Sequence, residues 1–189
     1  MKSQKLFDKY NDGQHWKDHS TAYSEKFADF LRNKNLNNRL IDAGCGNGRD
    51  VQVLNSAGFN VVGIDYSKKE IELAKKNFPS LKFEVQNIEK MKFKDNSISA
   101  FFCINIMHYV DQEKAINEFY RTLENKGYIF IQFNLEIKDK NENIDYKNSE
   151  KNILRLVSGF KIIKKEIVYR TDKTPIEHTH KILELILQK

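Results

Sequence analysis

The sequence has few cysteines, prolines and glycines, the residues on which disulfide-rich, proline-rich and collagen-like chains depend. Its 189 residues include only two cysteines, Cys45 and Cys103, which are too few for a disulfide framework. Two prolines and eight glycines exclude a collagen-like or proline-rich spacer. With 40% apolar and 12% aromatic residues, the chain has the composition of a folded protein. Its length predicts one domain over residues 1–189.

Long hydrophobic runs are also missing. The most apolar segment, 98–110, is interrupted by Ser99, Asn105 and His108 and is too short to span a bilayer. Residues 1–8 lack the apolar run of a secretory signal. We therefore expect no membrane partner and a cytoplasmic location.

Arginine is scarce, because most of the 32 basic residues are lysine. Arginine is the residue best suited to bidentate contacts with phosphates and base edges. The formal charge of +6 therefore indicates a solvated, lysine-rich surface more than a nucleic-acid partner.

What the chain does contain is an alternation of short apolar runs with longer amphipathic ones. The expected strands are 39–43, 60–64, 81–85, 98–104 and 128–133. The expected helices are 50–57, 67–78 and 111–123, the last two with Ser67 and Asp111 as N-caps. This alternation predicts an α/β fold with a parallel sheet covered on both faces.

The two ends of the chain differ from this pattern. Residues 160–169 and 178–187 read as two strands whose short connection requires antiparallel pairing. Residues 138–151 form a polar insertion, expected to be a loop before a short helix over 149–157. Ahead of the first strand, 17–33 predicts one or two helices.

The most informative segment is a glycine-rich turn at the end of the first strand. It contains Asp42, Gly44, Gly46 and Gly48 at alternate positions, and a helix follows. Glycines allow the main chain to approach a ligand closely, where free helix N–H groups point at it. The second strand ends at Asp65, whose carboxylate can accept hydrogen bonds from both ribose hydroxyls of an adenosine-containing ligand. Together they favour a nucleoside cofactor site over a purely structural turn.

The order Asp-x-Gly-x-Gly-x-Gly resembles motif I of the class I S-adenosylmethionine-dependent methyltransferases, whereas a dinucleotide fingerprint would need glycine in place of Arg49. The resemblance extends over residues 38–133. Within this class, the chain is similar to small type 11/25-like methyltransferase domains and has some similarity to tellurite-resistance-type methyltransferases. The resemblance implies a Rossmann-like, doubly wound, seven-stranded sheet that is mostly parallel and has an antiparallel C-terminal strand. It also implies S-adenosylmethionine as cofactor and S-adenosylhomocysteine as product.

The same resemblance implies roles for particular residues. Gly44, Gly46 and Gly48 would flank the methionine part of the cofactor, and Asp42 would orient the turn. The other implied contacts are Arg49 with the carboxylate, Asp65 with the ribose, Tyr66, Asn87 and Ile88 with the adenine, and the main chain of Cys103 beneath the methionine part. Arg49 could equally lie on the surface, and Ile88 could be purely structural.

His108 is the candidate catalytic residue, either as a general base near the acceptor or as a packing residue beneath the next helix. The pairs His15/His19 and His178/His180 have metal-compatible spacing but no evident carboxylate partner, so we expect no metal site.

The expected function is methylation of a small molecule at O, N or S, by a monomer or homodimer. An RNA or protein methyltransferase and a non-catalytic S-adenosylmethionine-binding module stay as alternatives. The expected division is an N-terminal helical lid (1–37), a cofactor-binding half (38–134) and a C-terminal half (135–189).

Overall fold

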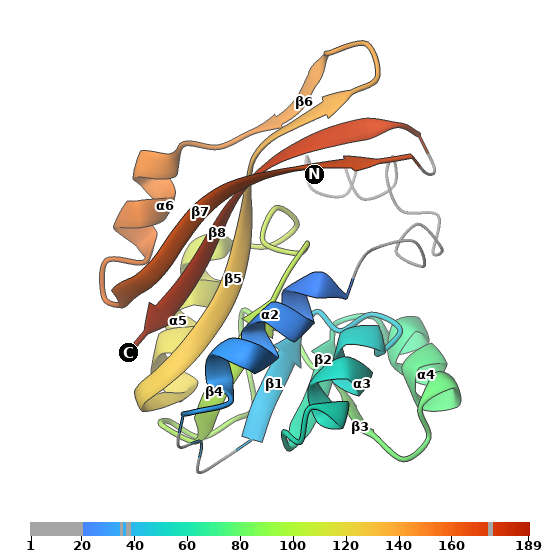
Figure 1. Cartoon of the computed structure of the whole chain (residues 1–189), viewed down its shortest axis with the longest axis vertical. Coiled ribbons are helices and arrows are strands. Elements are labelled where there is room, and N and C mark those ends of the chain that lie inside the picture. Colours follow the sequence, from blue (N-terminus) through green and yellow to red (C-terminus); the bar gives the residue numbers. More distant parts are fainter. Residues whose placement is uncertain (1–20, 35, 37–38, 174–175) are drawn as a thin grey trace.

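The computed structural model describes residues 21–189 apart from 35, 37–38 and 174–175 (Figure 1). One sheet of eight strands runs through this part of the chain, in the order β3-β2-β1-β4-β5-β8-β7, with β6 paired to β5. The strands are β1 (Arg39–Ala43), β2 (Val61–Asp65), β3 (Lys82–Val85), β4 (Ile98–Cys103), β5 (Leu123–Asp139), β6 (Ile144–Lys147), β7 (Lys161–Asp172) and β8 (His178–Gln188). The helices are α2 (Ala22–Leu31), α3 (Arg49–Ser56), α4 (Lys68–Asn77), α5 (Gln112–Thr122) and α6 (Glu150–Leu156).

Strands β1 to β5 pair in parallel, whereas β8 is antiparallel to β5 and β7 is antiparallel to β8. This confirms the predicted α/β, Rossmann-like sheet with an antiparallel C-terminal end. The chain moves outward from β1 to β2 and β3, then returns to place β4 on the other side of β1. Ligands of such sheets bind at this reversal, beyond the carboxyl ends of the strands.

Two apolar layers hold the sheet. On one face, Phe27 of α2, Leu54 of α3 and Ile71 of α4 are buried in one cluster with sheet residues such as Phe102. On the other face, Phe119 of α5 and Ile153 of α6 join a second buried cluster. Figure 1 shows α2, α3 and α4 together on one side of the strands, with α5 and α6 on the opposite side. The parallel strands are nearly continuous in apolar sequence because both of their faces are covered.

The predicted caps form as expected. The Ser67 hydroxyl accepts a hydrogen bond from the Glu70 N–H, and the Asp111 carboxylate accepts one from the Lys114 N–H. The Ser67 cap fixes the start of α4 at Lys68, three residues after Asp65.

The insertion over 138–151 differs from the expected loop. Strand β5 continues to Asp139, and β6 pairs with it antiparallel to form a hairpin before α6. Most of the N-terminal segment expected as a helical lid lies outside the described residues, including Tyr10, Trp16 and the His15/His19 pair. Within the described part, Tyr23 of α2 packs near Phe130 of β5, with ring centroids 6.4 Å apart. None of the described helices has the length and apolarity needed to cross a bilayer.

Candidate active site

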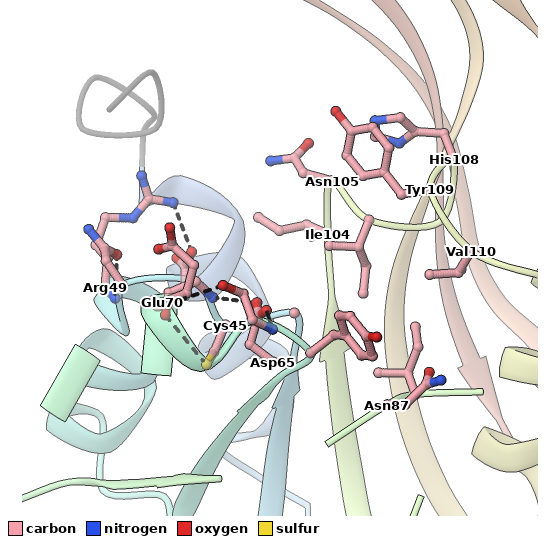
Figure 2. Close-up of a pocket in the computed structure, with 18 of the residues that line it drawn as sticks. Cys45, Arg49, Asp65, Glu70, Asn87, Ile104, Asn105, His108, Tyr109 and Val110 are labelled. Carbon is pink, nitrogen blue, oxygen red and sulfur yellow. Dashed lines mark hydrogen bonds and ion pairs between the residues drawn. The ribbon is translucent and has the colours of Figure 1, made fainter. Parts of the chain in front are cut away.

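A pocket of about 700 Å³ opens where the strand order reverses. Its volume lies within the usual range for small-molecule sites. Figure 2 shows two groups of side chains around it: Cys45, Asp65 and Glu70 beside the glycine turn, and Asn105, His108 and Tyr109 across the opening. The pocket therefore has a turn end and a histidine end.

The glycine turn and the Asp65 carboxylate meet, as the sequence predicted. The Gly46 N–H donates to Asp65 Oδ2 at 3.1 Å, and the Ser67 N–H donates to Asp65 Oδ1 at 2.8 Å. Burial raises the pKa of Asp65, while these backbone N–H groups oppose the rise. Each carboxylate oxygen has two lone pairs, so both can accept further hydrogen bonds from a ligand.

Space for a ligand lies against Gly46. Its φ of +48° is in the left-handed region, and a Cβ there would meet nothing closer than Glu70 Oε2 at 3.9 Å. Glu70 Oε2 is itself buried without a hydrogen-bond partner among the described residues. An open cradle beside an unpaired acceptor suits a ligand that carries hydrogen-bond donors, such as ribose hydroxyls or an amino group. The residues present therefore fit an adenosyl amino-acid cofactor.

Three of the predicted cofactor residues lie elsewhere. Asp42, Gly48 and Cys103 are not among the residues that line the pocket, although Gly44, Gly46 and Arg49 are. Gly48 is the N-cap of α3 with φ +87°, and a Cβ there would lie 2.6 Å from the Phe83 ring, so a side chain would not fit at this position. Cys103 is fully buried in the core, and the contact expected from its main chain stays a prediction.

The residues directly after β4 line the pocket, next to the position where a contact from Cys103 was expected. Ile104, Asn105 and Ile106 line the pocket directly after the strand. Asn105 has a left-handed φ of +61°, a conformation that asparagine tolerates better than most residues and that often marks functional sites. The side-chain oxygen of Asn105, Oδ1, accepts from Arg170 Nη1 at 2.7 Å.

The residues expected to contact the adenine lie at the pocket, and the contacts themselves stay a prediction. Tyr66, Asn87 and Ile88 all line the pocket. Tyr66 is 79% exposed, so its ring is available at the mouth. Asn87 Oδ1 already accepts from the Glu89 N–H at 2.8 Å, and Ile88 is buried in the core cluster as well as lining the pocket. Ile88 therefore lies both in the core and at the pocket, and both of the roles expected for it, adenine contact and packing, stay open.

His108 lies at the histidine end and is buried. Asn134 Nδ2 donates to His108 Nδ1 at 2.9 Å, so the neutral ring carries its hydrogen on Nε2. Burial lowers the pKa of His108 well below its usual range, and nearby His180, Arg170 and His178 lower it further. The ring is therefore neutral at pH 7 and offers a hydrogen-bond donor more readily than a base.

Sequence reasoning missed several residues at this end. Arg170, Asp172, His178 and His180 line the pocket from β7 and β8. The sequence predicted no carboxylate partner for the His178/His180 pair. This prediction is wrong, because Asp172 lies next to both histidines. The sequence signal for these residues was the short connection between β7 and β8, which indicates that the two strands pair. It gives the register of the pairing only once the strand ends are known.

Known proteins resemble this chain in sequence and in fold. A family model described as "Methyltransferase domain" matches residues 41–131. An uncharacterized protein of Methanocaldococcus jannaschii is 32% identical over 135 residues, covering 69% of this chain and 58% of that protein. A ubiquinone biosynthesis O-methyltransferase of Pelagibacter ubique is 34% identical over 99 residues, covering 50% of this chain and 41% of that protein. The chain thus spans about half the length of these relatives.

In fold, the chain is similar to a Burkholderia thailandensis 1,6-didemethyltoxoflavin-N1-methyltransferase solved with its substrate and S-adenosylhomocysteine. The TM-score is 0.71 at 15% identity, with 99% of this chain and 86% of that chain covered. The sheet order, the contact between the glycine turn and Asp65, and the matched domain agree with one another. Residues 41–131 of the chain thus match the methyltransferase-domain family, and the sheet around them has the Rossmann-like fold of S-adenosylmethionine-dependent methyltransferases.

Proposed function

We propose that this chain binds S-adenosylmethionine and transfers its methyl group to O, N or S of a small-molecule acceptor. The observation that carries the proposal is the hydrogen bond from Gly46 to Asp65 at the edge of an open pocket. This hydrogen bond supports the proposal because it joins a backbone that a ligand can approach closely to a carboxylate that can accept from ribose hydroxyls. In this proposal Asp65 accepts from the ribose hydroxyls, Gly44 and Gly46 border the methionine part, and Tyr66 and Ile88 flank the adenine.

The charge of the pocket favours a small molecule over RNA. Among its described lining residues are five carboxylates, from Asp50, Asp65, Glu70, Glu89 and Asp172, and two arginines, Arg49 and Arg170. A polyanion would need the opposite balance around the mouth. Two similar proteins, a ubiquinone biosynthesis O-methyltransferase and a 1,6-didemethyltoxoflavin-N1-methyltransferase, are named for small molecules, which supports this choice.

When bound, S-adenosylmethionine supplies an activated methyl group on a sulfonium. The chain's own residues would align the acceptor and exclude water, which provide most of the acceleration in such transfers. We assign His108 a hydrogen bond from Nε2–H to the acceptor, because Asn134 occupies its Nδ1. Tyr109 packs on the His108 ring, with centroids 3.9 Å apart, and restricts its position.

The first test is binding of S-adenosylhomocysteine measured by calorimetry. Wild type should bind one equivalent, and Gly46→Ala should weaken binding at least about tenfold, equivalent to about 1.4 kcal/mol. The added Cβ would enter the cradle in front of the turn. Gly58→Ala is the matched control: Gly58 has φ +96° and nothing within 4 Å of its Cβ position, so it shares the backbone cost without the cradle. Equal affinity in the two variants would contradict the proposed cofactor position.

The second test is turnover. S-Adenosylhomocysteine release should appear with one class of hydroxyl, amine or thiol compounds and not with RNA or protein. Binding without release over such a library would leave the non-catalytic module as the function. Both cysteines are free and buried, which suits a reducing compartment, and we propose a cytoplasmic location on that ground.

A further inference from the structure

The hairpin of β7 and β8 brings two histidines and an aspartate together at the histidine end of the pocket. Antiparallel register places Asp172 opposite His178, and Arg170 opposite His180. His178 and His180 are two residues apart on one strand, so their side chains lie on the same face. Asp172 Oδ2 lies 3.1 Å from His180 Nε2 and 3.6 Å from His178 Nε2. All three side chains are buried.

The hydrogen positions on these two rings follow from their other contacts. His178 Nδ1 lies 2.6 Å from the Ile176 carbonyl oxygen, and His180 Nδ1 lies 2.9 Å from Asn134 Oδ1. Both partners are acceptors, so each Nδ1 carries a hydrogen and donates it. A neutral imidazole has only one such hydrogen, so each Nε2 presents a lone pair.

Both lone pairs face the Asp172 carboxylate. His180 Nε2 is buried without a hydrogen-bond partner among the described residues. The Nε2 atoms of both histidines and an oxygen of Asp172 thus lie among atoms that are within 4.8 Å of one another, and Asp172 Oδ2 also accepts from Arg170 Nη2. Leaving the buried His180 Nε2 without a partner is costly, and a cation bound between it and the Asp172 carboxylate would remove that cost.

We propose that Asp172, His178 and His180 bind a divalent transition-metal ion. Two imidazoles and one carboxylate are a donor set typical of Zn²⁺ and Fe²⁺ sites that keep open coordination positions. Metal-bound histidines almost always donate their second ring N–H to an oxygen, as both histidines do here. Arg170 Nη2 donates to Asp172 Oδ2 at 2.9 Å and so orients the carboxylate from outside the group.

The place of this ion suggests what it would do. All three ligands line the same pocket as Gly44, Gly46 and Asp65. An acceptor hydroxyl or thiol bound at an open position would release its proton to solvent, because a divalent ion lowers the pKa of a bound group. The resulting lone pair would attack the methyl carbon while sulfur takes the electron pair of the breaking C–S bond. This role rests on the proposed function, whereas the ion binding itself does not.

The test uses the full chain after treatment with a chelator. Zn²⁺ binding is measured by calorimetry and Co²⁺ binding by visible absorption. Wild type should bind one equivalent, and His180→Gln and Asp172→Asn should each weaken binding at least about 100-fold. The control is the double variant His15→Gln/His19→Gln, which removes the other histidine pair of metal-compatible spacing and should bind as wild type does.

Loss of binding in the control but not in His180→Gln would overturn the proposal, as would the absence of saturable binding in wild type. In that last case a proton shared by His180 and Asp172 would fill the gap instead. S-Adenosylhomocysteine binding is measured on the same samples. If it persists without metal binding, only the metal site fails; if metal binds without it, only the proposed function fails. Circular dichroism of both variants shows whether each is folded, and either folded variant decides the result.

Discussion

Asp42 lies at the end of β1 with 3% of its surface exposed, and its Oδ2 has no hydrogen-bond partner among the described residues. Burial raises the pKa of Asp42 well above its usual range, and the nearby Asp50 and Asp65 carboxylates raise it further. A buried carboxyl in this environment destabilises the folded chain at neutral pH. The position of Asp42 beside the glycine turn therefore costs stability.

We therefore expect Asp42→Asn to stabilise the protein at pH 8 by about 1 kcal/mol. Because the pKa is raised in the folded chain, the folded state binds more protons than the unfolded state above about pH 4. The stability of wild type should then fall as pH rises through that range, and the advantage of the variant should shrink as pH is lowered toward 4. Urea unfolding at several pH values measures both curves. Parallel curves would show that Asp42 does not titrate with a raised pKa.

At this scale the sequence predicted the turn end better than the histidine end. Gly44, Gly46, Asp65, Tyr66 and Ile88 all line the pocket because their positions follow from where β1 and β2 end. The histidine end depends on the register of β7 against β8, which sequence periodicity does not fix. Cys103 does not line the pocket because β4 keeps that side chain in the core, whereas the next three residues do.

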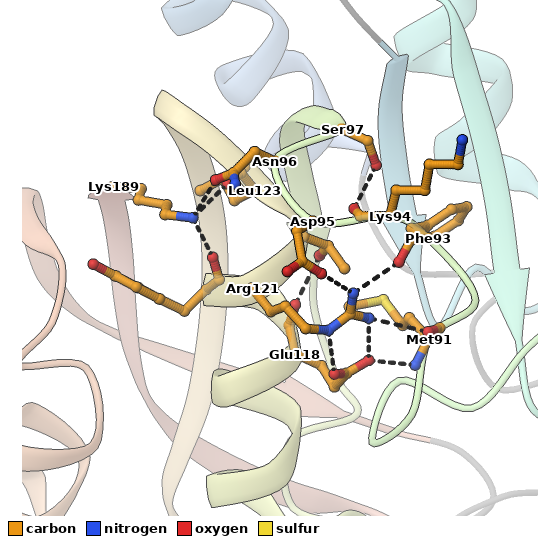
Figure 3. Close-up of polar contacts among 12 residues, drawn as sticks. Met91, Phe93, Lys94, Asp95, Asn96, Ser97, Glu118, Arg121, Leu123 and Lys189 are labelled. Carbon is orange, nitrogen blue, oxygen red and sulfur yellow. Dashed lines mark hydrogen bonds and ion pairs between the residues drawn. The ribbon is translucent and has the colours of Figure 1, made fainter.

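At the scale of elements, Arg121 of α5 holds the segment between β3 and β4. Its guanidinium donates to Glu118 and Asp95 and to the carbonyl oxygens of Met91 and Phe93 (Figure 3). Glu118 Oε2 in turn accepts from the Met91 N–H. This segment begins with the pocket residues Asn87 and Ile88, so α5 fixes one wall of the pocket from behind.

Arg121→Met should lower the free energy of unfolding by about 2 kcal/mol, because it leaves the Glu118 carboxylate and two carbonyl groups without their donor. S-Adenosylhomocysteine affinity should fall as well, since the wall loosens. Chemical denaturation and calorimetry measure the two effects. Arg32→Met is the control, because its pair with Asp29 is largely exposed and should contribute less than about 0.5 kcal/mol. A loss in Arg121→Met no larger than in the control would contradict this role.

The elements themselves were largely predictable. Apolar periodicity and caps located all the described helices to within a few residues, because each packs one face on the sheet. The β6 hairpin was missed because its residues, 144–147, are mostly exposed and polar and have no alternating pattern. Its pairing comes from the extension of β5 past the core, a tertiary effect that composition does not report.

At the scale of the whole molecule, one lysine joins the α2 layer to the antiparallel end of the sheet. Lys26 forms ion pairs with Glu166 of β7 and Glu184 of β8. Lys164 and Lys26 lower the pKa of Glu166 to about 2, which shows that the group is ionised at neutral pH. Glu184 is 3% exposed and also accepts from Gln132 Nε2 at 3.1 Å. Elements separated by about 140 residues of sequence are thus connected electrostatically.

Lys26→Met should cost about 2 kcal/mol of unfolding free energy, because it leaves the buried Glu184 without its cation. The figure lies below that for a fully buried pair, since Lys26 is partly exposed. Urea denaturation gives the value. Lys68→Met removes an exposed pair with Glu72 and should change stability by less than about 0.5 kcal/mol. Equal losses in the two variants would show that the link across the sheet contributes nothing.

The division of the pocket between two halves of the chain has a consequence for how such a protein could diversify. The matched domain ends at residue 131, whereas Asn134, Arg170, Asp172 and both histidines of the hairpin come after it. Substitutions in the last third of the chain could therefore exchange one acceptor for another while leaving the donor machinery untouched. Sequence similarity over the first part alone would then not identify the acceptor. Laboratory evolution of the acceptor preference could be confined to β7 and β8.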